Sequence, residues 1–138
     1  TVVSVFTISA SAANTEDTYY TYTWNNYSRY DYTPTRNKTN ATPVYIKTQE
    51  YTLPYNGYYA RTLYGTTANN ATKFASASEY WINNYTAYVI RANGTSVSQI
   101  KKYVRIRGHY SDTTYSWGDC KIAWSPDTTN ASNYTYLN

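Results

Sequence analysis

A short basic stretch contains the residues best suited to bind a charged ligand. On a β-strand, successive side chains point to opposite faces, so Val104 and Ile106 would enter the core while the residues between them face outward. Three cations beside one tyrosine suit an anionic polymer such as a sulfated glycan, a teichoic acid or a lipid headgroup. The alternative is a solvated strand whose charges discourage pairing with another sheet edge. The outward residues are Lys101, Tyr103, Arg105 and Arg107.

Aromatic side chains form a second group of candidates, because a flat ring can stack on the C–H face of a sugar. Tyr80 and Trp81 follow the small, polar segment 65–79, which predicts a long loop that leaves at least one of these rings exposed. Trp24 and Trp117 are further candidates, and the alternative is that the tryptophans all belong to the core. We therefore expect one ligand-binding surface that combines both groups: Tyr80, Trp81, Lys101, Tyr103, Arg105 and Arg107.

Groups suited to catalysis are scarce, because the chain has one histidine, His109, and one cysteine, Cys120. Nucleophilic catalysis needs an activated thiolate and a third, orienting group. Cys120 instead alternates in phase with Ile122 and Trp124, which predicts a buried and inert thiol. A zinc site needs three or four His, Cys or carboxylate ligands, and the eight acidic residues are scattered. We therefore expect no enzyme, no metal and no cofactor.

The chain is rich in Asn-x-Ser/Thr sequons. In a cell with N-glycosylation they would mark a heavily glycosylated surface protein. In most bacteria they would reflect only a composition rich in Asn, Ser and Thr. The sequence alone leaves both interpretations open for Asn26, Asn37, Asn40, Asn70, Asn84, Asn93, Asn130 and Asn133.

Residues 1–12 resemble the second half of a secretory signal. An apolar run passes into Ala10-Ser11-Ala12, the small-residue pattern that signal peptidase accepts. Cleavage after Ala12 would leave a single domain over residues 13–138. The alternative keeps this segment as a β-strand that adds to the open sheet edge of a neighbouring molecule. No stretch approaches the ~20 apolar residues of a membrane-spanning helix, so we expect no transmembrane segment.

Tyrosine dominates the composition and indicates the fold class. The 138 residues include 20 tyrosines, and aromatic residues make up 19% of the chain against 14% for charged residues. Aromatic and β-branched residues favour strands, and turn-forming residues separate them at the spacing of a sandwich. We predict a single antiparallel β-sandwich of about six or seven strands. The clearest strands cover residues 19–27, 43–51, 58–64, 85–91, 103–110 and 115–124.

Two segments form recognisable motifs: RYDYTPTRNKTN at residues 29–40, which runs into Val44-Tyr45, and WSPD at residues 124–127. They resemble motifs of small secreted proteins of Gram-positive, clostridial-type bacteria, a group without an established activity. The resemblance implies export and a β-rich single domain, and it transfers no functional residue. From the residues themselves, we expect a structural clasp in which Arg29, Asp31 and Arg36 pair across a corner at Pro34.

These observations favour a secreted or cell-surface protein that acts by contact, with cell-wall or host glycans as partners. The alternative is a self-assembling subunit of a filament or surface layer that binds copies of itself through residues 1–12. Nucleic acid is not an expected partner, because the net charge is only +4 and no nucleic-acid-binding motif is present.

Overall fold

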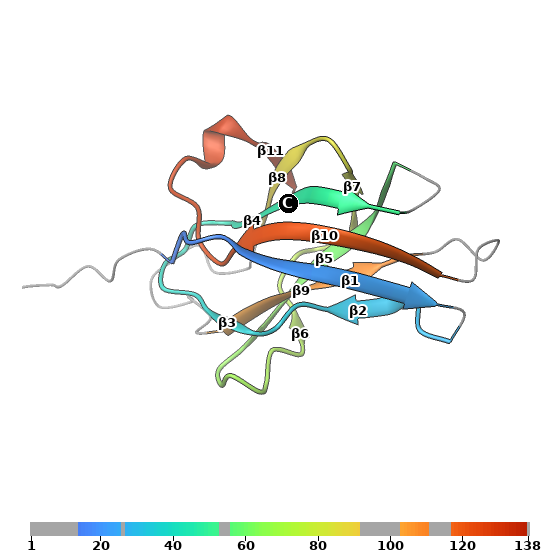
Figure 1. Cartoon of the computed structure of the whole chain (residues 1–138). Coiled ribbons are helices and arrows are strands. Elements are labelled where there is room, and N and C mark those ends of the chain that lie inside the picture. The colour runs from blue at the N-terminus through green and yellow to red at the C-terminus, as the bar shows by residue number, and fades with distance from the viewer. Residues whose placement is uncertain (1–13, 26, 53–55, 92–102, 111–116, 138) are drawn as a thin grey trace, which may run out of the picture.

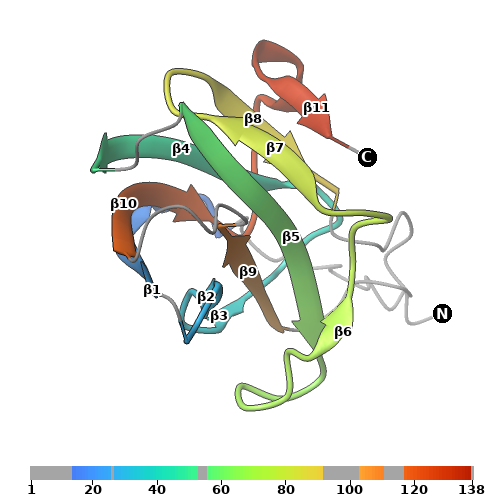
Figure 2. The same ribbon diagram turned by 90° about the vertical axis from the view of Figure 1, so that its right-hand side faces the viewer.

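The chain forms two β-sheets that enclose one core, as Figures 1 and 2 show for the computed structural model. The structure describes residues 14–25, 27–52, 56–91, 103–110 and 117–137. The predicted all-β sandwich is confirmed. The segment 1–12 and Lys101 lie outside the described residues.

Sheet A has five strands. Their spatial order is β1 (Thr18–Asn25), β10 (Trp117–Ser125), β4 (Val44–Tyr51), β8 (Ala87–Ile90) and β11 (Thr135–Leu137). The first three pairings are antiparallel, whereas β11 adds to β8 in parallel. The N-terminal strand of the described structure therefore lies beside the last long strand.

Sheet B is built around β5 (Gly57–Gly65) and β9 (Tyr103–His109), which pair along their length. The short strands β2 (Tyr30–Tyr32) and β3 (Arg36–Asn37) pair with the other edge of β9. The short strands β6 (Lys73–Phe74) and β7 (Tyr80–Asn83) pair with the other edge of β5. The chain passes from sheet B to sheet A through the turn between β7 and β8, which lie close together in Figure 2.

Stacked aromatic rings of β1 join the two sheets. Tyr22 and Trp24 are fully buried and stack with their ring centroids 5.3 Å apart. A buried phenol or indole needs a hydrogen-bond partner, and both find one on the opposite sheet. The Trp24 indole N–H donates to the carbonyl of Gly108 at 3.2 Å, and the Tyr22 hydroxyl donates to the carbonyl of Ile106 at 3.1 Å. These bonds fix sheet A against β9.

Strand β9 has a glycine, Gly108, where the Tyr22 and Trp24 rings contact its backbone. A Cβ atom on Gly108 would lie 2.8 Å from the Trp24 ring and 3.0 Å from the Tyr22 ring. Val104 and Ile106 fill the rest of the inward face, with no exposed surface. The outward face carries Tyr103, Arg105, Arg107 and His109, which confirms the predicted alternation over the described part of this stretch.

Cys120 and its in-phase neighbours Ile122 and Trp124 are buried, as predicted, and so are Tyr22 of β1 and Ile46 of β4. The strands number eleven in the described part of the chain rather than six or seven, because the additional ones are short. Strand β6 lies within the segment predicted as a loop, and β11 follows the last of the predicted strands. Elements of two or three residues are too short for an alternating pattern to reveal them.

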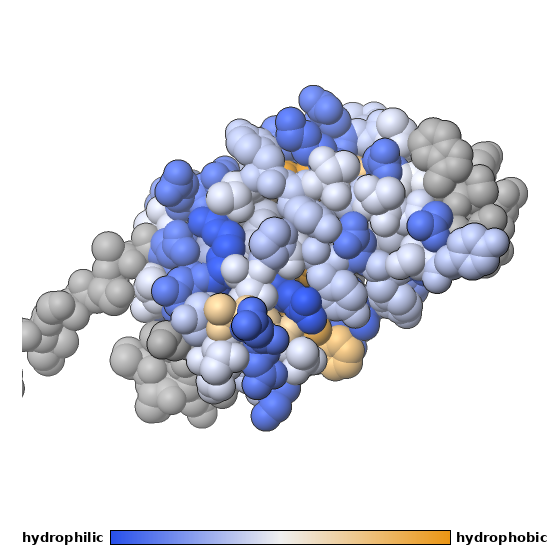
Figure 3. All heavy atoms as spheres, turned by 60° about the horizontal axis from the view of Figure 1, so that its bottom comes forward, coloured by the Kyte–Doolittle hydropathy of each residue, from blue (hydrophilic) through white to orange (hydrophobic). Residues whose placement is uncertain are grey.

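None of the described residues belongs to a helix long and apolar enough to cross a membrane. The face that comes forward in Figure 3 is mostly hydrophilic, and its hydrophobic areas are small.

Candidate functional site

The outward arginines of β9 lie against aromatic rings on both sides of the strand. The guanidinium of Arg105 is 4.3 Å from the ring centroid of Tyr32, and that of Arg107 is 4.6 Å from the ring centroid of Tyr30. Both tyrosines belong to β2, which pairs with β9. Arg107 also lies 5.0 Å from the ring centroid of Phe74, which β6 supplies from the other side. A cation over a ring face is worth roughly 0.5–1 kcal/mol at an exposed site.

A third arginine completes the arrangement. Arg61 on β5 is directly opposite Arg107 in the strand register, and like charges in this position repel each other. Phe74 offsets the repulsion, because the Arg61 guanidinium lies 3.6 Å from its ring centroid. Carbonyl groups hold the cations in place: Arg61 donates to Ala77 at 3.2 Å, and Arg105 donates to Ala71 at 2.7 Å. We define the cation–aromatic face as Tyr30, Tyr32, Arg61, Phe74, Arg105 and Arg107.

An acidic side chain and further rings continue this face at one end. Glu79 contacts the Arg107 guanidinium at 3.2 Å and Nδ1 of His109 at 2.9 Å. The His109 ring stacks on Tyr30 with centroids 4.3 Å apart, and it also lies 6.1 Å from the ring of Tyr59. Three arginines thus face one carboxylate, so the surface keeps a positive charge.

Trp81 extends the same row of rings and is open to solvent. Its ring meets that of Tyr59 edge to face at 5.2 Å. A Cβ atom on Gly57 would lie 2.7 Å from the Trp81 ring, so the indole rests on bare backbone. The exposed fractions are 43% for Trp81, 44% for Tyr30 and 47% for Phe74. The outer side of sheet B therefore offers ring surface next to fixed cations.

This arrangement can bind a ligand that is both anionic and able to stack. A guanidinium held flat on a ring still presents N–H groups at its edge to a carboxylate, sulfate or phosphate. The exposed rings supply apolar planes for C–H groups. Because backbone carbonyls and ring contacts already hold Arg61 and Arg105, binding would cost less side-chain ordering than it would for free arginines.

The predicted site residues are only partly brought together. Arg105 and Arg107 lie side by side on the cation–aromatic face, and Trp81 is exposed near its end. Tyr103 is half-buried at the start of β9, and Tyr80 is half-buried and packs against the core. Lys101 lies outside the described residues. Trp24 belongs to the core, as the alternative interpretation expected, whereas the side chain of Trp117 is not described.

Sequence reasoning missed Tyr30, Tyr32, Arg61 and Phe74 as members of the cation–aromatic face, and Glu79 and His109 beside it. Most of them come from other strands of sheet B or from the loop before β7, so their proximity depends on strand order rather than spacing. Two signals were available: His109 follows Arg107 by two positions on the same strand, and Phe74 is a lone large apolar residue in a polar segment.

The sequons differ in their exposure. Asn37, Asn70, Asn130 and Asn133 are exposed, whereas Asn40 is half-buried and its side chain accepts from the backbone N–H of Thr42 at 3.0 Å. Asn84 is buried, with 4% of its surface exposed, so a glycan there would not be compatible with the described fold. Asn26 and Asn93 lie outside the described residues.

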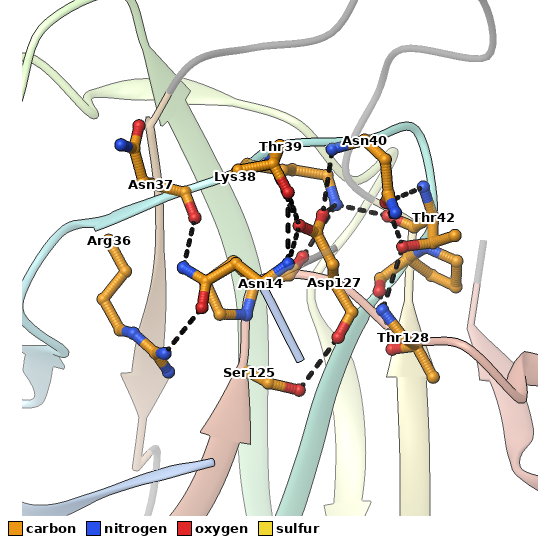
Figure 4. Close-up of polar contacts among 12 residues, drawn as sticks. Asn14, Arg36, Asn37, Lys38, Thr39, Asn40, Thr42, Ser125, Asp127 and Thr128 are labelled. Atoms are coloured by element: carbon orange, nitrogen blue, oxygen red, sulfur yellow. Dashed lines mark hydrogen bonds and ion pairs between the residues drawn. The ribbon is translucent and has the colours of Figure 1, made fainter. Parts of the chain in front are cut away.

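The two recognised motifs meet in a buried ion pair. Nζ of Lys38, from the first motif, lies 2.8 Å from Oδ1 of Asp127, the last residue of WSPD, and both side chains are almost fully buried (Figure 4). Lys38 also donates to the carbonyl groups of Pro126, at 2.7 Å, and of Thr42. All three ammonium protons therefore have an oxygen acceptor.

The carboxylate of Asp127 is equally well satisfied. It accepts from the backbone N–H of Asn14 at 2.8 Å and from the N–H and hydroxyl of Thr39 at 3.0 and 2.7 Å. Burial alone would raise the pKa of Asp127, but the hydrogen bond and charge of Lys38 and these donors outweigh it and hold that pKa below its ordinary value. We call Asn14, Lys38, Thr39 and Asp127 the motif lock; it gives both motifs a structural use.

The expected clasp takes a different form. The carboxylate of Asp31 accepts from the Tyr20 hydroxyl at 3.0 Å and from the backbone N–H of Thr23 at 2.9 Å. Arg36 instead donates to the carbonyl of Trp124 at 3.0 Å and lies 5.1 Å from the centroid of that ring. Asp31 and Arg36 therefore do not pair with each other across Pro34. Each hydrogen-bonds to a strand of sheet A instead, and so holds its own segment against that sheet.

The two potential nucleophilic partners are not brought together. Cys120 lies in the core on sheet A, and burial raises the pKa of its thiol to about 12, so the buried thiol that we predicted is confirmed. His109 lies on the outward face of sheet B beside Glu79. Within the described ranges, no three His, Cys, Asp or Glu side chains converge as a metal site would require.

Comparison with curated proteins and with solved structures gave no significant match. A family model described as a protein of unknown function, DUF2712, matches residues 8–128. The matched region contains β1 to β10, the cation–aromatic face and both halves of the motif lock. The chain therefore belongs to the DUF2712 family.

Proposed function

We propose that the protein is an extracellular contact protein that binds anionic glycans of a cell wall or a host surface through the cation–aromatic face. The observation that carries this proposal is the row of arginines held between exposed rings on sheet B. A glycan that carries carboxylates or sulfates offers both matching chemistries, since its charged groups can bond to guanidinium edges while its C–H faces stack on rings. The resemblance of the two motifs to those of secreted proteins supports the extracellular setting.

The proposal is tested by titrating the protein with a sulfated polysaccharide, with a polyuronate and with a neutral glucan of similar length. We expect the two anionic polymers to bind and the neutral one to bind much more weakly. Affinity should fall as salt is added, because salt screens exposed charges. Arg105→Gln and Trp81→Ala should each weaken binding roughly tenfold, because arginine and tryptophan are the residue types that most often dominate an interface.

A matched control is available on the other sheet. Lys121 lies 5.3 Å from the ring centroid of Tyr19, so it makes a similar cation–ring contact on sheet A. Lys121→Gln changes the net charge by the same amount as Arg105→Gln and should leave glycan affinity almost unchanged. Equal losses for both variants would show that only net charge matters, and the proposal of a specific face would fail.

A self-assembling subunit is the second candidate, and the position of β11 favours it. This strand pairs with β8 in parallel and is itself the outermost strand of sheet A, so an extended segment of another molecule could add to its outer edge. The segment that we expected to be donated, residues 1–12, lies outside the described residues. Light scattering on the full chain tests this candidate, and a monomer at all concentrations would exclude it.

A further inference from the structure

A polar cleft next to the motif lock shares no residue with the cation–aromatic face. It lies between the segment that enters β1 and the segment that follows β10, which come together at one end of sheet A in Figure 1. Its volume of 160 Å³ is room for roughly five water molecules, and a single sugar ring is of comparable size. The side chains that matter for the inference are Asp17, Tyr45, Ser125, Thr129, Asn130 and Tyr134.

The cleft contains one carboxylate whose charge is poorly compensated. Asp17 is an exposed residue of the cleft lining; its partial burial raises the pKa of its carboxyl group, and the neighbouring Ser125 and Arg36 offset that effect only in part. Arg36 already donates to the carbonyl groups of Glu16 and Trp124. Asp127 also lines the cleft, but its carboxylate is committed to the motif lock. The electrostatics therefore favour a positive group near Asp17 and disfavour an anion.

Two rings form an aromatic wall. Tyr45 and Tyr134 lie with their centroids 5.0 Å apart and their planes tilted by 57°. Asp17 lines the same cleft as these two rings. Burial raises the pKa of Tyr45, and the charge of Asp17 and the neighbouring Tyr134 add to the effect. Tyrosine faces attract ammonium groups and also stack on sugar C–H groups.

Uncommitted polar side chains complete the cleft. The side chains of Thr129 and Asn130 make no hydrogen bond within the described part of the chain, whereas the Thr128 hydroxyl next to them donates to the carbonyl of Pro43 at 2.8 Å. A hydroxyl and an amide that face an open cleft can both donate and accept. They suit the hydroxyl groups of a sugar.

We infer that this cleft binds an amino sugar in its ammonium form, with the ammonium beside Asp17 and the ring against Tyr45 and Tyr134. The hydroxyl groups of the sugar bond to Thr129 and Asn130. A divalent cation is a poorer occupant, because Asp17 is the one carboxylate of the cleft that is not already committed. The inference goes beyond the proposed function, since it concerns a separate site with the opposite charge preference.

The test uses three sugars that differ at one position: glucosamine, N-acetylglucosamine and glucose. Each is titrated into the full-length protein, and binding is followed by NMR chemical shifts of the backbone amides. We expect glucosamine to bind at least tenfold more tightly than the two uncharged sugars, with the largest shifts at residues 129–134. Equal affinities for the three sugars, or no binding of glucosamine, would overturn the inference.

Two variants separate the carboxylate from the general charge of the protein. Asp17→Asn should abolish the preference for glucosamine over glucose. Asp119→Asn, a matched change on β10 outside this cleft, should retain it. Loss of the preference in both variants would overturn the assignment to Asp17. The polysaccharide titrations of the first proposal do not depend on this outcome, so the two proposals can fail separately.

Discussion

At the scale of single residues, the motif lock has the strongest consequence for stability. Lys38 and Asp127 are both almost fully buried, and each charge has its partners within the lock or in nearby carbonyl groups. Desolvating two charges is costly, so such a pair adds little net stability compared with an apolar pair, but removing one partner leaves the other buried and uncompensated. The lock is therefore most sensitive to a change on one side only.

Asp127→Ala is expected to lower the free energy of unfolding by about 3–5 kcal/mol, because it leaves the Lys38 ammonium and several backbone N–H groups without their acceptor. Urea unfolding followed by tryptophan fluorescence measures the change. Lys38→Met alone should also destabilise the fold, and the double variant should lose less than the sum of the two single losses. A loss within about 0.5 kcal/mol for Asp127→Ala, as for a neutral surface change, would contradict the lock.

At the scale of elements, β9 carries both the contact with the core and the candidate site. Its inward face meets the rings of β1 through Gly108, and its outward face carries Arg105 and Arg107. A change in the packing of β9 would therefore move the arginines relative to Tyr30 and Phe74. Stability of this strand and geometry of the cation–aromatic face are coupled.

Gly108→Val tests that coupling. The added side chain would collide with the Trp24 and Tyr22 rings, and overpacking of this kind costs about 1–3 kcal/mol. Thermal unfolding should detect the loss, and glycan affinity should fall as well. Lys47→Val on the exposed side of β4 is the control and should be close to neutral. A Gly108→Val protein as stable as the wild type would contradict this prediction, because it would show that the Trp24 and Tyr22 rings can move aside.

The edge of sheet A gives a second prediction at this scale. Deleting residues 131–138 removes β11 and leaves the backbone groups of β8 without a neighbour on that side. Open edges pair with other chains, so the shortened protein should dimerise or aggregate in light scattering. Tyr136→Ser, which changes an exposed ring but keeps the strand, should remain like the wild type.

At the scale of the whole molecule, buried acidic groups set the pH range of stability. The pKa of Asp127 is lower in the folded state, so its contribution is present above its ordinary value of 3.8 and is lost as the pH falls. The pKa of Cys120 is raised from 9.0 to about 12, and burial also raises those of Tyr22 and Tyr58. The unfolded chain then binds fewer protons than the folded one at alkaline pH, so stability falls as the pH rises above 9.0.

We therefore expect a stability plateau near neutral pH, a decline in acid and a steeper decline in alkali. Urea unfolding at pH 3, 7 and 10 measures it. Cys120→Ser retains the fold's polar contact with Thr48 but removes one alkaline titration, so its decline between pH 7 and 10 should be shallower. A wild-type stability that rises over the same interval would contradict the assignment of buried neutral phenols and thiol.

The fold was predictable from the sequence to a larger extent than the site. Alternation alone placed Val104, Ile106 and Cys120 in the core, because a strand with one buried face has period two. It left open whether Trp24 faces the core or the solvent. Alternation also placed Arg105 and Arg107 outside. It could not show that Tyr30 and Phe74 flank them, because neighbours across a sheet depend on strand order and register. The motif lock escaped prediction for the same reason: Lys38 and Asp127 are 89 positions apart.

That separation has a consequence for how the chain acquires its structure as it is made. Strand β1 pairs with β10, so the first described strand cannot pair until the last long strand has been synthesised. Lys38 likewise cannot form its ion pair until Asp127 has been synthesised. Contacts between such distant segments make folding slow, because the intervening chain must first be brought together. A nascent chain that ends before residue 117 has neither the partner of β1 nor the carboxylate that pairs with Lys38. The described domain can therefore complete its fold only once the chain has been made through residue 127.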